Sequence, residues 1–191
     1  MTFARSPELM SRTDTALLVV DVQEKLIPFI PGHRRLVWNI GRLLQAAEIL
    51  GLPTLATEQY PRGLGHTVPE LAARLPQPVP EKSCFSCRER DELFTGLVDR
   101  GIDKLLVAGI EAHVCVQQTV LDLLGQMFRV YVAVDAVGSR FPLDQEIALR
   151  RMESAGAVLT TTEAAMFEWC EFSGTPEFKQ ISSLVKEQPP E

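Results

Sequence analysis

The sequence predicts an α/β fold in which helices cover both faces of a parallel sheet, and two observations support this. Short apolar runs rich in β-branched residues occur at 15–21 (TALLVVD), 104–110 (KLLVAGI) and 129–135 (RVYVAVD), as in strands buried on both faces. Segments with helical spacing of apolar residues separate these runs, and this alternation is typical of parallel sheets. The length and the 46% hydrophobic content fit one domain over residues 1–191, with a core over about residues 15–186.

Each element follows from its local pattern. After the first strand, apolar residues recur at helical spacing over 36–50, until Gly51-Leu52-Pro53 ends the helix. A loop rich in Pro and Gly (QYPRGLG) follows the second strand. The remaining expected elements, in order, are strand 53–58, a short helix 68–74, a weak strand 79–82, helix 91–100, strand 104–110, helix 113–127, strand 129–135, helix 144–155, strand 157–161, and helices 163–172 and 176–186.

Composition excludes several classes of function. The formal net charge is −6 and no run of Lys and Arg occurs, so we expect no nucleic-acid partner. No apolar run approaches the ~20 residues of a membrane span, and the first residues lack the apolar core of a secretory signal. We therefore expect a cytoplasmic protein with no membrane contact. Its four cysteines are then expected to be reduced thiols.

Polar residues at the ends of buried strands are the first candidates for a functional site, because ligands of open α/β sheets bind outside the carboxyl ends of the strands. Asp21 ends the first apolar run, Lys82 ends the weak strand, and Cys115 follows 104–110 where a helix begins. Taken singly, each has an ordinary explanation, as a turn residue, a solvated lysine and a core thiol respectively. The three together favour a catalytic interpretation.

Their chemistry is that of acyl transfer. The N–H groups and dipole of a helix N-terminus stabilise a thiolate, and a nearby ammonium adds to this, so we expect the pKa of Cys115 to be low. A carboxylate can accept the thiol proton, with Lys82 balancing the charges. The thiolate attacks a carbonyl, backbone N–H groups at the helix start hold the oxyanion, and water hydrolyses the thioester.

Other combinations are less well supported. His113 precedes Cys115 by two residues, which on a helix is a rotation of roughly 200°, so His113 is poorly placed as its base. The segment CFSC (84–87) has CxxC spacing, but no second Cys or His pair completes a zinc site and no strong strand precedes it. The sequence also lacks a P-loop and a complete dinucleotide fingerprint, so no nucleotide cofactor is expected.

Five segments in order, LLVVDVQEKL (17–26), TEQYPRGLGHTVPEL (57–71), EKSCFSC (81–87), VAGIEAHVCVQQTVLDLL (107–124) and VAVDAVGSR (132–140), resemble the isochorismatase-like cysteine hydrolases. The similarity is greatest to the isochorismatase-domain branch that carries a TEQYP-GLG segment. The resemblance implies a three-layer α/β/α sandwich with a mostly parallel, six-stranded, Rossmann-like sheet. It also implies an Asp21, Lys82 and Cys115 triad, and a cis peptide between Ile110 and Glu111 beside the oxyanion site.

Two departures from the family limit the function. Nicotinamidases of the family bind a metal through Asp-x-His and a further His, whereas this chain has Glu58-Gln59-Tyr60 and then His66, so no catalytic metal is expected. Isochorismatases proper generally lack the cysteine, so Cys115 favours amide or related acyl substrates. For a small-molecule substrate, the loops at the strand ends supply Gln59, Tyr60, Phe85 and His113 as candidate contacts.

The sequence therefore predicts a cofactor-independent cysteine hydrolase that cleaves a C–N bond of a small amide through a thioester. Two alternatives remain open. One is isochorismatase-type ether hydrolysis by Asp21 without the thiol, and the other is a non-catalytic binding or scaffold protein. The apolar segment AAMFEWCEF (164–172) either packs on the sheet or forms a subunit contact, and we expect a homo-oligomer.

Overall fold

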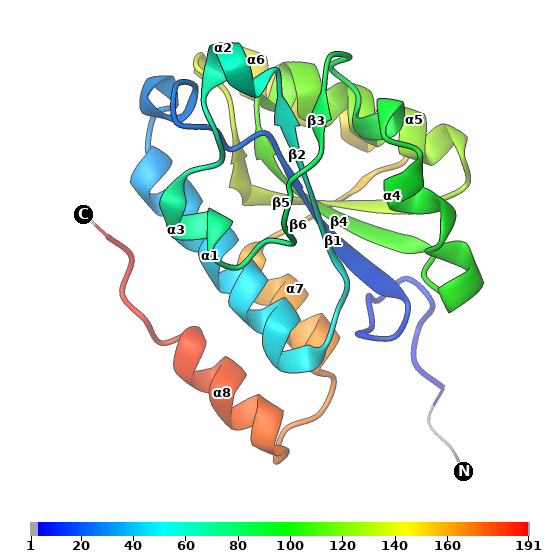
Figure 1. The fold of residues 1–191 in the computed structure, drawn as a ribbon. Helices are drawn as coiled ribbons and strands as arrows, with labels where there is room; N and C mark the ends of the chain where they lie inside the picture. Colours follow the sequence, from blue (N-terminus) through cyan, green and yellow to red (C-terminus); the bar gives the residue numbers. More distant parts are fainter. Residues whose placement is uncertain (1–3, 191) are drawn as a thin grey trace.

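The computed structural model describes residues 4–190 and contains one six-stranded sheet, in which every neighbouring pair of strands is parallel (Figure 1). The strand order is β3-β2-β1-β4-β5-β6. Helices lie on both faces, which confirms the predicted α/β fold. The strands are β1 (Thr15–Val20), β2 (Thr54–Gln59), β3 (Glu81–Lys82), β4 (Lys104–Ile110), β5 (Arg129–Gly138) and β6 (Val158–Thr160).

Two apolar clusters fill the space between the sheet and its helices. Side chains of β1 alternate between them, because successive residues of a strand point to opposite faces. Leu17 and Val19 belong to one cluster, and Leu18 and Val20 to the other. The first cluster is covered by α1 (His33–Leu50), α3 (Pro69–Ala72), α7 (Thr162–Cys170) and α8 (Pro176–Leu184), and the second by α4 (Glu92–Thr95), α5 (Gln117–Gly125) and α6 (Pro142–Ser154).

The carboxyl ends of β1 and β4 lie side by side at the point where the strand order reverses. From β1 the chain continues to β2 and β3 on one side, whereas β4 leads to β5 and β6 on the other. Such a switch point leaves a crevice at the carboxyl edge, where ligands bind in open α/β sheets. Asp21 follows β1 and Glu111 follows β4, so both residues lie at this point.

The helices differ from the sequence prediction in three places. The expected helix 113–127 begins as a π-helical turn (Ala112–Val116) and becomes α-helical only in α5. The expected helix 91–100 is broken into α4 and a 3₁₀ turn (Val98–Arg100), with Gly96 at the break. An additional short helix, α2 (Pro61–Leu64), lies in the loop after β2. No helix within residues 4–190 has the length and apolar character to span a membrane.

The apolar segment 164–172 packs mainly within its own chain. Met166 and Trp169 of α7 are fully buried against the first cluster, whereas Phe167 and Phe172 remain exposed. A helix turn places residues three apart on the same face, so Met166 and Trp169 point inward together. The packing interpretation therefore holds for these two side chains, and they are not available for a subunit contact.

Candidate active site

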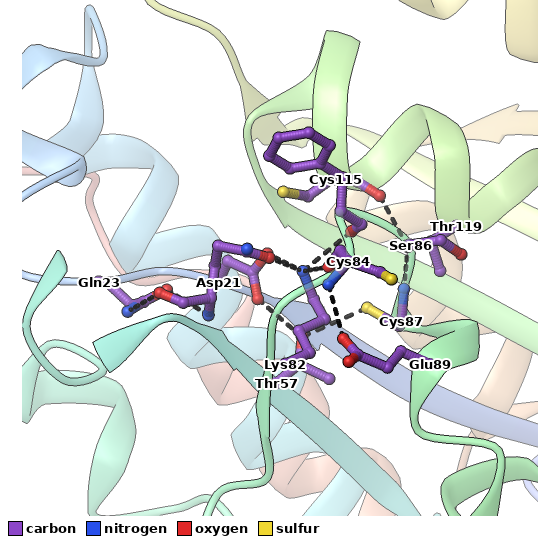
Figure 2. A network of polar contacts seen from close by, with 12 residues as sticks. Asp21, Gln23, Thr57, Lys82, Cys84, Ser86, Cys87, Glu89, Cys115 and Thr119 are labelled. Carbon is purple, nitrogen blue, oxygen red and sulfur yellow. Dashed lines mark hydrogen bonds and ion pairs between the residues drawn. The ribbon is translucent and has the colours of Figure 1, made fainter. Parts of the chain in front are cut away.

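Asp21 is held as a buried carboxylate by residues of β2 and β3. Its backbone φ is +52°, in the left-handed region that residues with a side chain rarely adopt. The Thr57 hydroxyl donates a hydrogen bond to Oδ1 (2.8 Å), and the Lys82 ammonium donates one to Oδ2 (2.6 Å) (Figure 2). Both carboxylate oxygens of Asp21 are therefore fixed before any substrate enters.

Lys82 is an internal cation. Its Nζ lies 2.6 Å from Asp21 Oδ2, 2.7 Å from Gln59 Oε1, and 2.9 and 3.3 Å from the carbonyls of Phe85 and Cys84. An ammonium has three protons, so these four acceptors saturate it. Burial alone would lower the pKa of Lys82, but the negative charge of Asp21 raises the pKa above its ordinary value. Lys82 therefore stays charged and stabilises Asp21.

Cys115 completes the group from the opposite side of the switch point. It lies in the π-helical turn after β4, only 6% of its surface is exposed, and the charges of Asp21 and Lys82 both act on its thiol. The Thr119 hydroxyl, four residues further along the chain, donates a hydrogen bond to the Cys115 carbonyl (2.7 Å) and so holds the backbone of this turn in place. The structure thus brings Asp21, Lys82 and Cys115 together.

The expected low pKa of Cys115 is wrong for the resting protein. Burial and the Asp21 carboxylate raise the pKa of the thiol far above its ordinary value, and the charge of Lys82 only partly opposes them. Burial also raises the pKa of Asp21, against the effect of Lys82. Burial of the thiol and the negative charge of Asp21 outweigh any stabilisation by the helix terminus. The resting site therefore holds a thiol beside a carboxylate, as general-base activation requires.

The two cysteines of the 84–87 segment have different environments. Cys84 is exposed, whereas Cys87 is fully buried, with its Sγ 3.3 Å from the Thr57 hydroxyl that also binds Asp21. Burial and the Asp21 charge raise the pKa of Cys87 to about 11. Cys87 is thus an inert packing residue that contacts Thr57, which in turn binds Asp21.

Glu111 and His113 are the polar side chains at the start of the turn that carries Cys115. The peptide between Ile110 and Glu111 is cis. Glu111 is buried and forms an ion pair with Arg140 (Nε to Oε1, 2.8 Å). His113 Nδ1 lies 3.0 Å from the Ser139 hydroxyl and 3.6 Å from Glu111 Oε2. His113 therefore contacts the loop after β5.

The predicted substrate contacts divide into two kinds. Gln59 is buried and both ends of its amide are used internally: Oε1 accepts from Lys82, and Nε2 donates to the Ser83 carbonyl (2.8 Å). Gln59 is thus a support of Lys82, which corrects the prediction that it faces the substrate. Tyr60 and Phe85 are both more than half exposed at the same edge of the sheet, so their rings are free for a ligand.

Sequence reasoning missed the residues that hold the three predicted groups in place. Thr57 binds Asp21, and Thr119 binds the Cys115 carbonyl. Gln23 accepts from the Gln59 N–H (2.7 Å) and donates to the Gln59 carbonyl (3.0 Å). Spacing carried a signal: Thr57 and Gln59 share one face of β2, and Thr119 lies four residues after Cys115 on a helix.

The residues at the position of the family's metal site bind one another. Glu58 Oε1 accepts from the N–H (2.6 Å) and the hydroxyl (2.8 Å) of Thr67, and Oε2 lies 3.0 Å from His66 Nδ1. Within residues 4–190, no group of three or more His, Cys, Asp or Glu side chains is arranged to hold a metal ion. The Glu58 carboxylate thus anchors the loop after β2.

The fold, together with Asp21, Lys82 and Cys115 at its switch point, defines a Rossmann-like α/β protein with an enzyme-type site. The family model of the isochorismatase domain matches residues 15–164. The mouse protein named isochorismatase domain-containing protein 2A is 40% identical over 176 residues, which are 92% of this chain and 84% of that protein. The chain therefore belongs to the isochorismatase-domain family of hydrolases.

Solved structures agree with this assignment. A Caenorhabditis elegans structure described as MAR1 ribonuclease has a TM-score of 0.86 and 40% identity, and the match covers 96% of this chain and 95% of that chain. The YcaC gene product of Escherichia coli, described as an octameric hydrolase of unknown specificity, has a TM-score of 0.83 and 25% identity, with coverage of 95% and 92%.

Proposed function

We propose that this protein is a cofactor-independent cysteine hydrolase that cleaves the C–N bond of a small amide through a thioester. One observation carries the proposal: the buried Asp21–Lys82 ion pair adjoins the Cys115 thiol at the switch point of the sheet. A carboxylate, a thiol and a fixed cation are the groups that nucleophilic acyl transfer needs.

In the first half-reaction, Cys115 Sγ attacks the amide carbonyl carbon while its proton passes to Asp21. Proton transfer accompanies formation of the C–S bond, because the raised pKa of Cys115 opposes a free thiolate in the resting protein. Backbone N–H groups of the 110–115 segment hold the oxyanion. Collapse of this intermediate breaks the C–N bond, and Asp21 returns the proton to the departing amine, which leaves as ammonia from a primary amide.

In the second half-reaction, water attacks the thioester carbonyl and gives its proton to Asp21. The C–S bond breaks, the carboxylic acid leaves, and the sulfur regains the proton. Lys82 keeps its charge throughout and stabilises the carboxylate form of Asp21 between the steps. The exposed rings of Tyr60 and Phe85 suit a small planar or short-chain substrate.

The test is an ammonia-release screen over small primary amides. Wild-type protein is compared with Cys115→Ala, and Cys84→Ala serves as the control because Cys84 is an exposed thiol of the same region. We expect turnover by wild type and Cys84→Ala and none by Cys115→Ala. Full activity of Cys115→Ala would instead favour ether hydrolysis by Asp21, and this alternative also predicts activity after alkylation of the thiol.

The name of the Caenorhabditis elegans relative raises RNA cleavage as a second candidate. Two features of this chain argue against it: the net charge is −6, and all the protons of Lys82 are taken by internal acceptors. We therefore propose a small-molecule substrate and no nucleic-acid partner. A single-stranded RNA oligonucleotide belongs in the same screen, and its cleavage by wild type with none by Cys115→Ala would reverse this conclusion.

We also propose that the protein is a homo-oligomer. An octamer is described for the Escherichia coli relative. Leu143 and Ile147 of α6 are exposed, as is Phe141 just before this helix. Residues four apart, such as Leu143 and Ile147, share one face of a helix. This strip, Phe141, Leu143 and Ile147, is the proposed subunit contact.

A further inference from the structure

The loop of residues 83–86, called here the 83–86 loop, takes its shape from side chains of the site. Lys82 donates to the carbonyls of Cys84 (3.3 Å) and Phe85 (2.9 Å), and Gln59 donates to the carbonyl of Ser83 (2.8 Å). Three successive carbonyls of the loop therefore depend on Lys82, which binds Asp21, and on Gln59, which accepts a hydrogen bond from Lys82. The loop belongs to the catalytic network through its carbonyl side.

A single carboxylate holds the opposite, N–H side. Glu89 Oε2 accepts hydrogen bonds from the backbone N–H groups of Ser83 and Cys84, each at 2.6 Å. Glu89 ends a 3₁₀ turn (Cys87–Glu89), in which the Ser86 hydroxyl accepts a hydrogen bond from the Arg88 N–H. These two bonds lower the pKa of Glu89, so the carboxylate is charged at neutral pH. Hydrogen bonds to an ionised acceptor are stronger than neutral ones.

Both ends of the 83–86 loop are anchored to catalytic groups. Its first neighbour, Lys82, pairs with Asp21, and the N–H of its last neighbour, Cys87, donates to the Thr119 hydroxyl (2.9 Å), which donates to the Cys115 carbonyl (2.7 Å) (Figure 2). The loop thus borders the space between base and nucleophile. Phe85, half exposed, lies on it.

We propose that Glu89 is a positioning residue of the active site: its carboxylate fixes the 83–86 loop, so that the loop carbonyls hold Lys82 and the Phe85 ring forms a fixed wall for the substrate. This inference rests on the proposed function for its substrate. Among residues 4–190, the side chain of Glu89 makes hydrogen bonds to the loop N–H groups and none to Asp21 or to the Cys115 thiol. Its effect is therefore exerted through the loop.

The test compares Glu89→Ala, which removes the acceptor, with Glu89→Gln, which keeps one acceptor oxygen without the charge. Glu92→Ala is the matched control, because Glu92 is an exposed acid of the neighbouring helix and its ion pair with Arg90 is long, at 3.7 Å. We expect Glu89→Ala to raise KM about tenfold while kcat stays within about twofold, since the loop positions the substrate but does not react. Glu89→Gln should have a KM close to that of the wild type, and Glu92→Ala should match the wild type in both KM and kcat.

Two further readouts do not depend on turnover. In Glu89→Ala, hydrogen exchange of the Ser83 and Cys84 amides and alkylation of Cys115 by iodoacetamide should each be about tenfold faster, with the global unfolding midpoint unchanged. Exchange and alkylation rates equal to those of wild type would overturn the proposal, as would an unchanged KM. Absence of any amide substrate for wild type would instead overturn the proposed function, and these two rates would still decide the role of Glu89.

Discussion

Lys82 Nζ lies 2.6 Å from Asp21 Oδ2, and neither side chain has any surface exposed to solvent. Removing one partner of such a pair leaves an unpaired buried charge. We therefore expect Lys82→Met to reduce the free energy of unfolding by about 3–5 kcal/mol, as for other broken buried pairs. Urea unfolding measures this loss.

The matched variant for this experiment is the double mutant Lys82→Met with Asp21→Asn. It carries no buried charge at the pair, so it should recover at least about half of the lost free energy. A loss below about 1 kcal/mol in Lys82→Met would place the pair in a much more polar environment than the structure gives it.

The thiol of Cys115 should react slowly at neutral pH. Because burial and the Asp21 charge raise its pKa, the thiolate fraction is lower than that of an ordinary thiol at every pH below that pKa, and it grows as the pH rises. At about pH 7, iodoacetamide should therefore alkylate Cys115 more than tenfold more slowly than the exposed Cys84. Peptide mass spectrometry separates the two sites.

Asp21→Asn supplies the control, because it removes the negative charge that raises the pKa of Cys115 and leaves Lys82, which lowers it. Alkylation of Cys115 at fixed pH should be faster in this variant. A Cys115 that reacts faster than Cys84 in the wild type at neutral pH would mean that the thiolate forms before the substrate binds, and general-base activation by Asp21 would not be needed.

Gly109 is required by its backbone and by its neighbour on β1. Its φ is +130°, and a Cβ there would overlap the carbonyl of Val20. We expect Gly109→Ala to cost more than about 3 kcal/mol of unfolding free energy, because two core strands must separate. Gly125→Ala, at a position with ordinary φ and open space, should change stability by less than about 1 kcal/mol. Equal effects of the two substitutions would contradict the strand packing at Gly109.

The strip on α6 predicts the state of assembly. Light scattering of the wild type should give a mass that is a multiple of 21.2 kDa, and Leu143→Glu should shift it toward one chain by placing a charge in the apolar contact. Val98→Glu, at another exposed apolar residue, should leave the mass unchanged. A wild-type mass near 21.2 kDa would reject the oligomer.

The fold was predictable from sequence because the signals it depends on are local. The continuous apolar run of Thr15–Val20 and the similar runs at 104–110 and 129–135 can be recognised from strand-length stretches of sequence alone. Asp21, Lys82 and Cys115 were found because a parallel sheet brings its carboxyl ends to one edge. The π-helical turn that carries Cys115 was not predictable, since no apolar period distinguishes five residues of π-helix from the first turn of an α-helix.

The electrostatics of the site depend on distances that the sequence does not contain. The position at a helix start favours a low pKa of Cys115, but the burial of the thiol and the charge of Asp21 shift this pKa upward. Gln59 was expected to face the substrate because it ends β2, yet Lys82 and Ser83 use both ends of its amide. Roles that depend on which partner a side chain selects were the ones missed.

The proposed mechanism requires that Cys115 carries an acyl group during turnover, and intact-mass spectrometry of acid-quenched protein detects such a group. With an amide that releases ammonia, wild type should gain the mass of the acyl group, located by peptide mapping on Cys115 and removed by hydroxylamine. Cys84→Ala should gain the same mass and Cys115→Ala none. Release of ammonia by Cys115→Ala at the wild-type rate, without any adduct, would rule out a thioester on Cys115.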